Sequence, residues 1–568
     1  MKRHMFKVLA LMLAVMLLAG CGKTPAPTTT AAPETTAPAS TAQETETPGR
    51  QVPDTETTEP ETTEPAATEP ESTAPATTEA EPVVEAALPA LFTQTVYDYS
   101  FDGNRDVFLA ESYYGLVSLS EQSAKDYPML AAAMKAEKDE EAKRKEEFLQ
   151  NFNSGAKSQY EEDKESFRKN YLHGDVLVRR ADRRIVSFLY DEDVYYGMKH
   201  RERYMTGVNF ETQTGKRLDL RDVVTDVDKL GQLIYDELKI FYGDGVYEDL
   251  KASDIDWSRL KETAWTLDPY GITFYFGYRE LTEYSAGNPT VTLSFAEHPD
   301  LVKKEYQEAE EQYCVEFSVD RPMYFDLDGT GTPDIIGVEG QENMDGAFET
   351  LSVLVNGHWY DKDGFYAYNL NPVFVHTGKG RNYVYVHTAS DNDYQTFENF
   401  KVESGTTGYL GTTSCGWHYE MPSDASLGYL RSVLTDPRAF VLDTRTDLLS
   451  TINGTCPYYV DSNGRPKTDQ TWYDLSYTLT FTAKADVPVT LVTKEGKKVG
   501  EGVVPKGTKL GYVRTDDKSW GDFIISEGGP ISDVAYDYVR VDVEIRDWTK
   551  YVNNVDIEEL FDGIMFAG

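Results

Sequence analysis

Short runs of apolar residues separated by polar ones recur along the chain from about residue 88 onward. T-V-Y-D-Y-S-F (95–101) alternates from Tyr97, whereas G-D-V-L-V-R-R (174–180) and R-I-V-S-F-L-Y (184–190) contain consecutive apolar residues. Short runs of this kind, rich in β-branched and aromatic residues, predict strands. Further strands are predicted over 272–278 and 290–295.

Two segments between these strands have helical character instead. Pro128 opens a charged segment that predicts a helix over 128–168, with a break near Asn153–Gly155. The charged run D-E-E-A-K-R-K-E-E (139–147) predicts a solvated helix face. A second helix is predicted from Asp226, because apolar residues recur at spacings of three and four: Leu230, Leu233, Ile234, Leu238 and Phe241.

Strands with helices on one face of an antiparallel sheet indicate an α+β domain, which we expect over residues 88–310. The second half predicts strands alone, including L-S-V-L-V (351–355), N-Y-V-Y-V-H-T (382–388) and A-F-V-L-D (439–443). We therefore expect a β region over 311–470 and a small β-barrel with the C-terminal tail over 471–568. The predicted fold class is multidomain, α+β followed by all-β.

The N-terminus predicts a targeting signal. A basic start (residues 1–7) precedes an apolar run of about eleven residues, Val8–Leu18, which is too short to span a membrane. The run ends in Leu18-Ala19-Gly20-Cys21, which resembles the lipobox of bacterial lipoproteins. The resemblance implies a signal peptide over 1–20, lipidation of Cys21, and anchoring at the outer face of the cell membrane. The alternative is an ordinary secretory signal followed by a chance cysteine.

Residues 21–87 predict a disordered stalk. Thr, Pro, Glu and Ala recur in loose repeats such as T-T-E-P-E-T-T-E-P, and between residues 24 and 86 the only basic residue is Arg50. So few apolar residues cannot offset the entropy lost on ordering. Proline and self-repulsion keep such a chain extended, so we expect it to hold the folded part away from the membrane.

The net charge disfavours one class of partner, and the spacing of the cysteines disfavours a cysteine-bound metal. The 568 residues carry a formal net charge of −41, which argues against a nucleic-acid partner because such binders neutralise phosphates with clustered Lys and Arg. Three cysteines remain besides Cys21, without metal-ligand spacing: Cys314, Cys415 and Cys456. A Cys415–Cys456 disulfide and buried free thiols are both compatible with this number.

The stretch Y-F-D-L-D-G-T-G-T-P-D-I-I-G-V (324–338) predicts a calcium loop. Oxygen donors stand at positions 1, 3, 5, 7 and 9, and Gly331 at position 6 permits a sharp turn. Three nearby carboxylates repel one another, and a divalent cation converts that repulsion into binding. The expected ligands of a structural Ca²⁺ are Asp326, Asp328, Thr330, Thr332 and Asp334.

This loop differs from an EF-hand, because position 12 is Gly337 and the flanking segments are strands. It resembles the calcium loops of VCBS and FG-GAP repeats of β-propellers, except that Thr330 stands where the family has Asp, which weakens the site. The resemblance implies that the β region over 311–470 is a partial propeller-like region. The alternative is a polar Asp/Gly turn without an ion.

Past residue 475, V-V-P-K-G-T-K-L-G-Y-V-R-T-D and the following W-G-D-F-I-I resemble bacterial SH3-like barrels.

The first domain also resembles a family. V-N-F-E-T-Q-T-G-K-R-L-D-L (208–220), Gly197-Met-Lys-His200 and D-P-Y-G-I-T-F-Y-F (268–276) are similar to RsiV-type ectodomains (DUF4163/DUF3298) over about 95–305. Members of that family include lysozyme-binding sensors and modules attached to a deacetylase. The resemblance implies a module of the cell envelope. The lipobox and the lack of a deacetylase segment separate this chain from both activities.

Sequence patterns of known catalytic sites are missing. The chain has no H-E-x-x-H, no G-x-S-x-G and no G-x-x-x-x-G-K-[ST], and no two of its eight histidines stand at i, i+4. We therefore expect a non-enzymatic surface protein that binds peptidoglycan or a basic wall hydrolase such as lysozyme. The alternatives are a glycan-modifying enzyme with an unrecognised site, and a structural spacer.

Overall fold

The strands predicted over 95–101, 174–180 and 184–190 lie in one seven-stranded sheet, together with two short strands from the second half of the chain. The computed structural model describes residues 87–197, 200–319, 321–420, 428–528 and 531–567, so the predicted signal peptide, Cys21 and almost all of the stalk lie outside it. The strand order is β19-β20-β1-β2-β3-β4-β5, in which β2 and β3 are parallel and the other neighbours antiparallel. The strands are β1 (Leu91–Phe101), β2 (Phe108–Leu119), β3 (Asn170–Ala181), β4 (Ile185–Tyr195), β5 (Glu202–Glu211), β19 (Tyr419–Glu420) and β20 (Leu430–Ser432).

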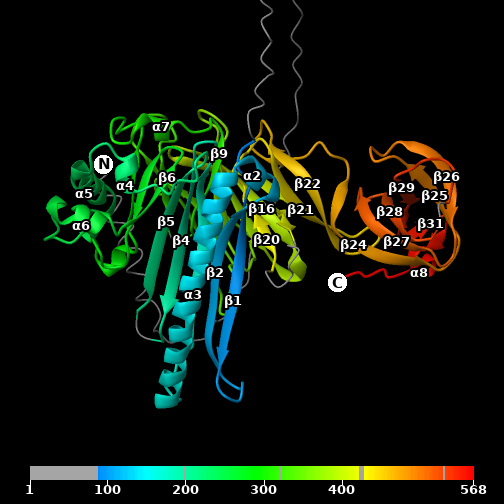
Figure 1. Cartoon of the computed structure of the whole chain (residues 1–568), viewed down its shortest axis with the longest axis horizontal. Helices are drawn as coiled ribbons and strands as arrows, with labels where there is room; N and C mark the ends of the chain where they lie inside the picture. The colour runs from blue at the N-terminus through cyan, green and yellow to red at the C-terminus, as the bar shows by residue number, and fades with distance from the viewer. Residues whose placement is uncertain (1–86, 198–199, 320, 421–427, 529–530, 568) are drawn as a thin grey trace, which may run out of the picture. The chain divides into compact units, whose positions relative to one another are not determined.

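Two helices connect the parallel strands β2 and β3. The short α2 (Glu121–Asp126) begins at Ser120, whose side chain accepts a hydrogen bond from the Ser123 N–H, and α3 (Pro128–Glu162) follows. Figure 1 shows α3 running along the strands of the sheet. Its buried apolar residues meet the sheet in two clusters, Leu130 and Met134 toward one end and Leu149, Phe152 and Ala156 toward the other.

The expected break in this helix is wrong, because α3 is continuous through Asn153–Gly155. Glycine in a helix interior costs only about 0.5–1 kcal/mol relative to alanine. Burial of Phe152 and Ala156 on either side outweighs that cost. The Asn153 side chain also donates a hydrogen bond of 2.7 Å to Asp98 on β1.

The charged run of α3 is also only partly solvated. Glu141 and Lys145 are buried against the sheet, where Lys145 pairs with Glu141 at 3.4 Å and with Glu192 of β4. Buried charges are tolerated when each has an opposite partner, and this partner comes from a distant strand. The sequence pattern of the helix alone does not contain that information.

A three-stranded sheet and short helices complete the α+β region. The strands β6 (Ala264–Asp268), β7 (Gly271–Tyr275) and β8 (Thr290–Ser294) are antiparallel, and the predicted apolar stripe forms α5 (Leu230–Tyr242). Their side chains share one core. Short elements surround it: α4 (Leu220–Val223), α6 (Trp257–Leu260), α7 (Lys304–Gln307), η1 (Val227–Lys229), η2 (Gly243–Gly245), η3 (Ala252–Asp254) and η4 (Tyr284–Ala286).

The next segment forms two antiparallel sheets that pack face to face. One has the order β10-β11-β12-β13 and the other β17-β16-β15-β14-β9, and side chains of both meet in one core that includes Ile336, Val353, Phe374 and Phe400. The first comprises β10 (Met323–Phe325), β11 (Asp334–Glu339), β12 (Leu351–Val355) and β13 (His358–Lys362). The second comprises β9 (Tyr313–Glu316), β14 (Asn371–His376), β15 (Asn382–Ala389), β16 (Gln395–Glu403) and β17 (Thr406–Thr413), with η5 (Asp391–Asp393) between β15 and β16.

The remaining strands form an eleven-stranded sheet and a small three-stranded one. Phe481, Tyr512 and Phe523 lie at the centre of their core. The chain is therefore α+β at first and β-rich afterwards. These elements are β18 (Gly416–Trp417), β21 (Phe440–Thr446), β22 (Ile452–Val460), β23 (Pro466–Lys467), β24 (Tyr473–Ala483), β25 (Val487–Val492), β26 (Lys498–Val504), β27 (Lys509–Thr515), β28 (Trp520–Glu527), β29 (Tyr538–Asp542), β30 (Glu544–Arg546), β31 (Thr549–Val552), β32 (Val555–Asp556), α8 (Ile557–Leu560) and β33 (Phe561–Asp562).

Strand pairing crosses both of the expected domain boundaries at residues 310 and 470. Strands on both sides of residue 310 join the seven-stranded sheet, where Phe92 of β1 pairs with Ser432 of β20. The eleven-stranded sheet likewise contains strands from both sides of residue 470.

Within the described residues, no helix has the length and apolar character needed to cross a membrane.

Candidate functional site

The face of the seven-stranded sheet opposite α3 is covered over one half and open over the other. Strand β6 contacts β3, β4 and β5, and β9 contacts β3, so these strands cover one end of the face. At the other end, the side chains of Tyr97, Tyr99 and Phe101 on β1 are 60%, 51% and 37% exposed. Large exposed rings on a rigid sheet are typical of a binding surface.

Aromatic rings continue from β1 across the next three strands. Tyr97 on β1 lies opposite Tyr113 on β2, which lies beside His173 on β3. The ring centroids are 6.1 Å apart for Tyr97–Tyr113, 4.7 Å for Tyr113–His173, 4.5 Å for His173–Tyr171 and 5.3 Å for Tyr171–Tyr195. We call these five residues the aromatic row. Strand register creates it, because residues on one face of neighbouring strands stack side by side.

One end of the aromatic row opens into a pocket of about 320 Å³, here called the sheet pocket. The pocket lies where β9, β14 and β18 meet the sheet, and the sheet strands β19 and β20 line it as well. A concave site with aromatic walls and a few polar groups is the usual form of a small-ligand site. Its lining includes Thr95, Tyr97, Tyr113, Asp175, Asp191, Glu316, Asn371, Trp417, Tyr419 and Arg431.

Two aspartates of the sheet pocket differ in their partners. Asp191 on β4 accepts hydrogen bonds from Arg203 Nε at 2.6 Å and Arg203 Nη2 at 2.7 Å. The carboxyl of Asp175 on β3, directly opposite Asp191, makes no hydrogen bond or ion pair with any other described residue. Loss of hydration within the concave pocket and the neighbouring Asp191 charge raise the pKa of Asp175 to about 6. Asp175 is thus an unpaired carboxyl that a ligand can reach.

A buried polar group joins the pocket wall to the sheet. Arg431 donates to Glu316 Oε1 at 2.8 Å and to Thr93 Oγ1 at 3.0 Å, and its guanidinium lies 4.8 Å from the Trp417 ring centroid. Glu316 also accepts the Val178 N–H at 2.9 Å. These contacts fix the wall in place, which favours a pre-formed pocket.

The predicted calcium loop connects β10 to β11. Its three carboxylates can each place an oxygen within 4.8 Å of the others, and none of them pairs with Lys or Arg in the described part of the chain. Asp326 accepts the N–H groups of Gly329 at 2.8 Å, Thr330 at 3.0 Å and Gly331 at 2.7 Å. Both loop glycines have positive φ, 73° at Gly329 and 87° at Gly331, as a tight wrap requires.

The five expected ligands differ in how the structure places them. Asp328 is exposed, and hydrogen bonding from Thr330 lowers its pKa, whereas Asp334 is buried and accepts the Leu327 N–H at 2.9 Å and the Ser404 hydroxyl at 2.7 Å. Thr332 is exposed on the same loop. The clustered carboxylates are compatible with a Ca²⁺ site. The hydrogen bonds from backbone amides to Asp326 are equally typical of a polar turn without an ion.

The cysteines resolve one alternative left open by the sequence. Cys314, Cys415 and Cys456 are all buried free thiols. Burial raises the pKa of each of these thiols, which makes them poor nucleophiles at neutral pH.

Sequence reasoning missed the aromatic row and Asp175. The signal was present in Y-D-Y-S-F (97–101) and Y-L-H-G-D (171–175), where aromatic or acidic residues occupy every second position. Residues of the same period on one strand share a face. Only the pairing of β1 with β2, and of β2 with β3, shows that the two segments meet.

No protein-family model and no curated protein matches this chain. Solved structures that match include a DUF3298 family member from Bacteroides fragilis, at 15% identity and a TM-score of 0.29, covering 38% of this chain and 94% of that one. Another is a DUF3298 family protein from Pseudomonas aeruginosa, at 14% identity and a TM-score of 0.27, covering 40% and 99%.

Proposed function

We propose that this chain is a non-enzymatic, lipid-anchored protein of the bacterial cell surface that binds a ligand of the cell envelope. Lipidation of Cys21 would hold it at the outer face of the membrane, and residues 21–87 would form its stalk. The resemblance to RsiV-type ectodomains (DUF4163/DUF3298) is part of this proposal. So are the VCBS-like loop and the SH3-like C-terminal region.

One observation carries the binding proposal: the aromatic row leads into the sheet pocket. Aromatic faces offer apolar area with little conformational entropy to lose, and the pocket adds unpaired polar groups such as Asp175. A sugar ring presents an apolar face and a polar rim, which matches this combination. Peptidoglycan glycan is therefore the first ligand we propose.

A basic wall hydrolase such as lysozyme is the second ligand of the same class. The net charge of −41 attracts a basic protein over long range, and Asp175 adds an unpaired acid in the sheet pocket. Nucleic acid is not proposed, since the chain has no excess of positive charge.

The Asp326 loop supports a structural calcium ion in this proposal. Asp326, Asp328 and Asp334, with Thr330 and Thr332, would supply the oxygen ligands, and the ion would join the β10 and β11 ends. The loop is not part of the sheet-pocket lining, so its role would be to stabilise the fold.

Co-sedimentation of the purified protein with isolated peptidoglycan tests the binding proposal. We expect the wild-type protein to sediment and the double variant Tyr97→Ala/Tyr113→Ala to stay in the supernatant. Tyr477→Ala is the matched control, because Tyr477 is 54% exposed on β24, close to the 60% of Tyr97. Sedimentation of the double variant at the wild-type level would contradict the proposal.

A glycan-cleaving enzyme is the second candidate, and one pair of residues favours it. Asp175 has a raised pKa of about 6, while Asp191 opposite it is paired with Arg203. Two carboxyls in different environments are a known arrangement for acid and base roles in glycoside cleavage. Release of reducing ends from peptidoglycan, lost in Asp175→Asn, would replace the binding proposal by this one.

A further inference from the structure

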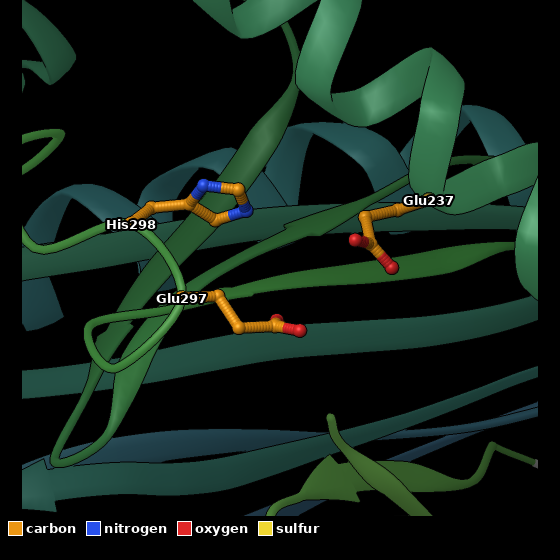
Figure 2. A group of neighbouring side chains, drawn as sticks. All are labelled: Glu237, Glu297 and His298. Atoms are coloured by element: carbon orange, nitrogen blue, oxygen red, sulfur yellow. The ribbon is translucent and has the colours of Figure 1, made fainter. Parts of the chain in front are cut away.

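A second group of polar side chains lies between α5 and the loop that follows β8. Glu237 projects from α5, and Glu297 and His298 come from the loop. Figure 2 shows the three side chains converging on the space between the helix and the loop. One ligand atom of each residue lies within 4.8 Å of those of the other two.

Negative charge at this group has no basic partner. In the described part of the chain, neither Glu237 nor Glu297 pairs with a Lys or an Arg. Burial and the neighbouring Glu297 charge raise the pKa of Glu237 to about 7, and burial, with a smaller contribution from the Asp326 charge, raises the pKa of Glu297. Acids from α5, the β8 loop and the Asp326 loop therefore attract a cation to one place.

The imidazole of His298 provides an independent observation. Its Nε2 atom is buried and has no hydrogen-bond partner among the described residues. A buried nitrogen without a partner destabilises the folded state. A ligand that occupies this position would remove that cost, and imidazole nitrogen together with carboxylate oxygen is a common set of metal ligands.

We propose that Glu237, Glu297 and His298 bind a divalent transition-metal ion of the zinc class. Imidazole nitrogen with carboxylate oxygen suits Zn²⁺ and its neighbours, whereas Ca²⁺ takes oxygen ligands alone. Zinc ligands lie about 2.0–2.2 Å from the ion at tetrahedral angles, so two of them are about 3.4 Å apart. The three ligand atoms lie within 4.8 Å of one another, so side-chain rotation on binding would draw them closer by up to about 1.4 Å.

The surrounding structure orients two of the three ligands. The Ser294 hydroxyl accepts the Glu297 N–H at 3.1 Å and donates to Glu297 Oε2 at 3.3 Å. The Ser294 carbonyl accepts the His298 N–H at 3.0 Å, which fixes the turn that carries both residues. Outer contacts of this kind typically set the direction of metal ligands. A bound ion would clamp α5 to β8 and leave one coordination position open.

Calorimetric titration of the chelator-treated full chain with Zn²⁺ tests this site. Excess Ca²⁺ is kept present to occupy oxygen-only sites, and a reductant keeps the buried thiols reduced. We expect one equivalent of Zn²⁺ to bind, and His298→Ala and Glu237→Gln each to weaken binding at least tenfold. Co²⁺ in place of Zn²⁺ should give a visible absorption band that His298→Ala abolishes.

Matched controls separate the site from general charge effects. His358→Ala and Glu248→Gln remove an exposed imidazole and an exposed carboxylate elsewhere, and they should bind Zn²⁺ as the wild-type protein does. Glu237→Gln keeps the shape of the side chain, so it remains informative if His298→Ala fails to fold. Absence of zinc binding by the wild-type chain, or unchanged affinity in both ligand variants, would overturn the proposal.

Discussion

Asp175 shows how one side chain acquires its properties from its surroundings. It lies on the open face of β3, opposite Asp191, and its carboxyl reaches solvent through the sheet pocket. Its pKa of about 6 is above the ordinary 3.8, so the folded state holds this proton at a pH where the unfolded chain has released it. Its contribution to stability is therefore largest below pH 4 and is lost as pH rises through 6.

Replacement of this residue tests the argument directly. Asp175→Asn should stabilise the protein at pH 7.5 by on the order of 0.5 kcal/mol, because solvent in the pocket screens the repulsion that the variant removes. At pH 4.5 the gain should shrink, since the wild-type carboxyl is then mostly protonated. Urea unfolding at both pH values measures this, with Asp249→Asn as an exposed control. An equal gain in the free energy of unfolding at the two pH values would show that ionisation of Asp175 is not the cause of the gain.

At the scale of elements, α3 illustrates packing that overrides local preference. Gly155 lies inside the helix, and a Cβ atom added there meets nothing within 4 Å. Gly155→Ala should therefore raise the free energy of unfolding by about 0.5–1 kcal/mol through reduced chain entropy.

Gly207 on β5 is the contrasting position, where a Cβ would lie 1.9 Å from the Trp265 carbonyl oxygen. Gly207→Ala should destabilise the protein by roughly 1–3 kcal/mol through overpacking. Thermal or urea unfolding of both variants gives the comparison. Loss of stability in Gly155→Ala would show that α3 needs flexibility at this residue.

The loop between β10 and β11 makes a separate prediction. If it binds Ca²⁺, saturation at a hundred times Kd should stabilise the protein by about 2.7 kcal/mol relative to EDTA. Asp328→Asn should remove this gain with little other effect, because Asp328 is exposed, whereas Asp334 also supports the loop by hydrogen bonds. Asp363→Asn, in the similar D-K-D-G turn at 361–364, should keep the gain.

Melting temperatures in Ca²⁺ and in EDTA provide the measurement for this loop. Equal values for the wild-type protein in both conditions would leave the polar turn as the correct interpretation. A gain that Asp328→Asn preserves would place the calcium ion elsewhere in the chain.

At the scale of the whole molecule, net charge governs the approach of a partner. With −41 charges, attraction to a basic hydrolase extends about one Debye length, roughly 10 Å at 0.1 M salt and 3 Å at 1 M. Affinity for lysozyme, measured by calorimetry between 0.05 and 0.5 M NaCl, should therefore fall steeply with salt. Salt-independent binding would assign the contact to apolar surface such as the aromatic row.

Local pattern predicted several elements, since period and turn residues act within a few positions. The stripe from Leu230 to Phe241 forms α5, and the strand predicted over 184–190 overlaps β4 (Ile185–Tyr195). Burial of charged residues of α3 was not predictable from local pattern. Lys145 is buried because Glu192, on a strand far along the chain, neutralises it.

The sequence by itself determined the strand and helix periods, the order of an α+β region before a β-rich one, and the clustering of Asp326, Asp328 and Asp334. These properties depend on neighbours in the chain. Tertiary structure alone decided the aromatic row, the sheet pocket and the meeting of Glu237 with His298. Each of these depends on the register and packing of segments distant in sequence, which composition and spacing do not encode.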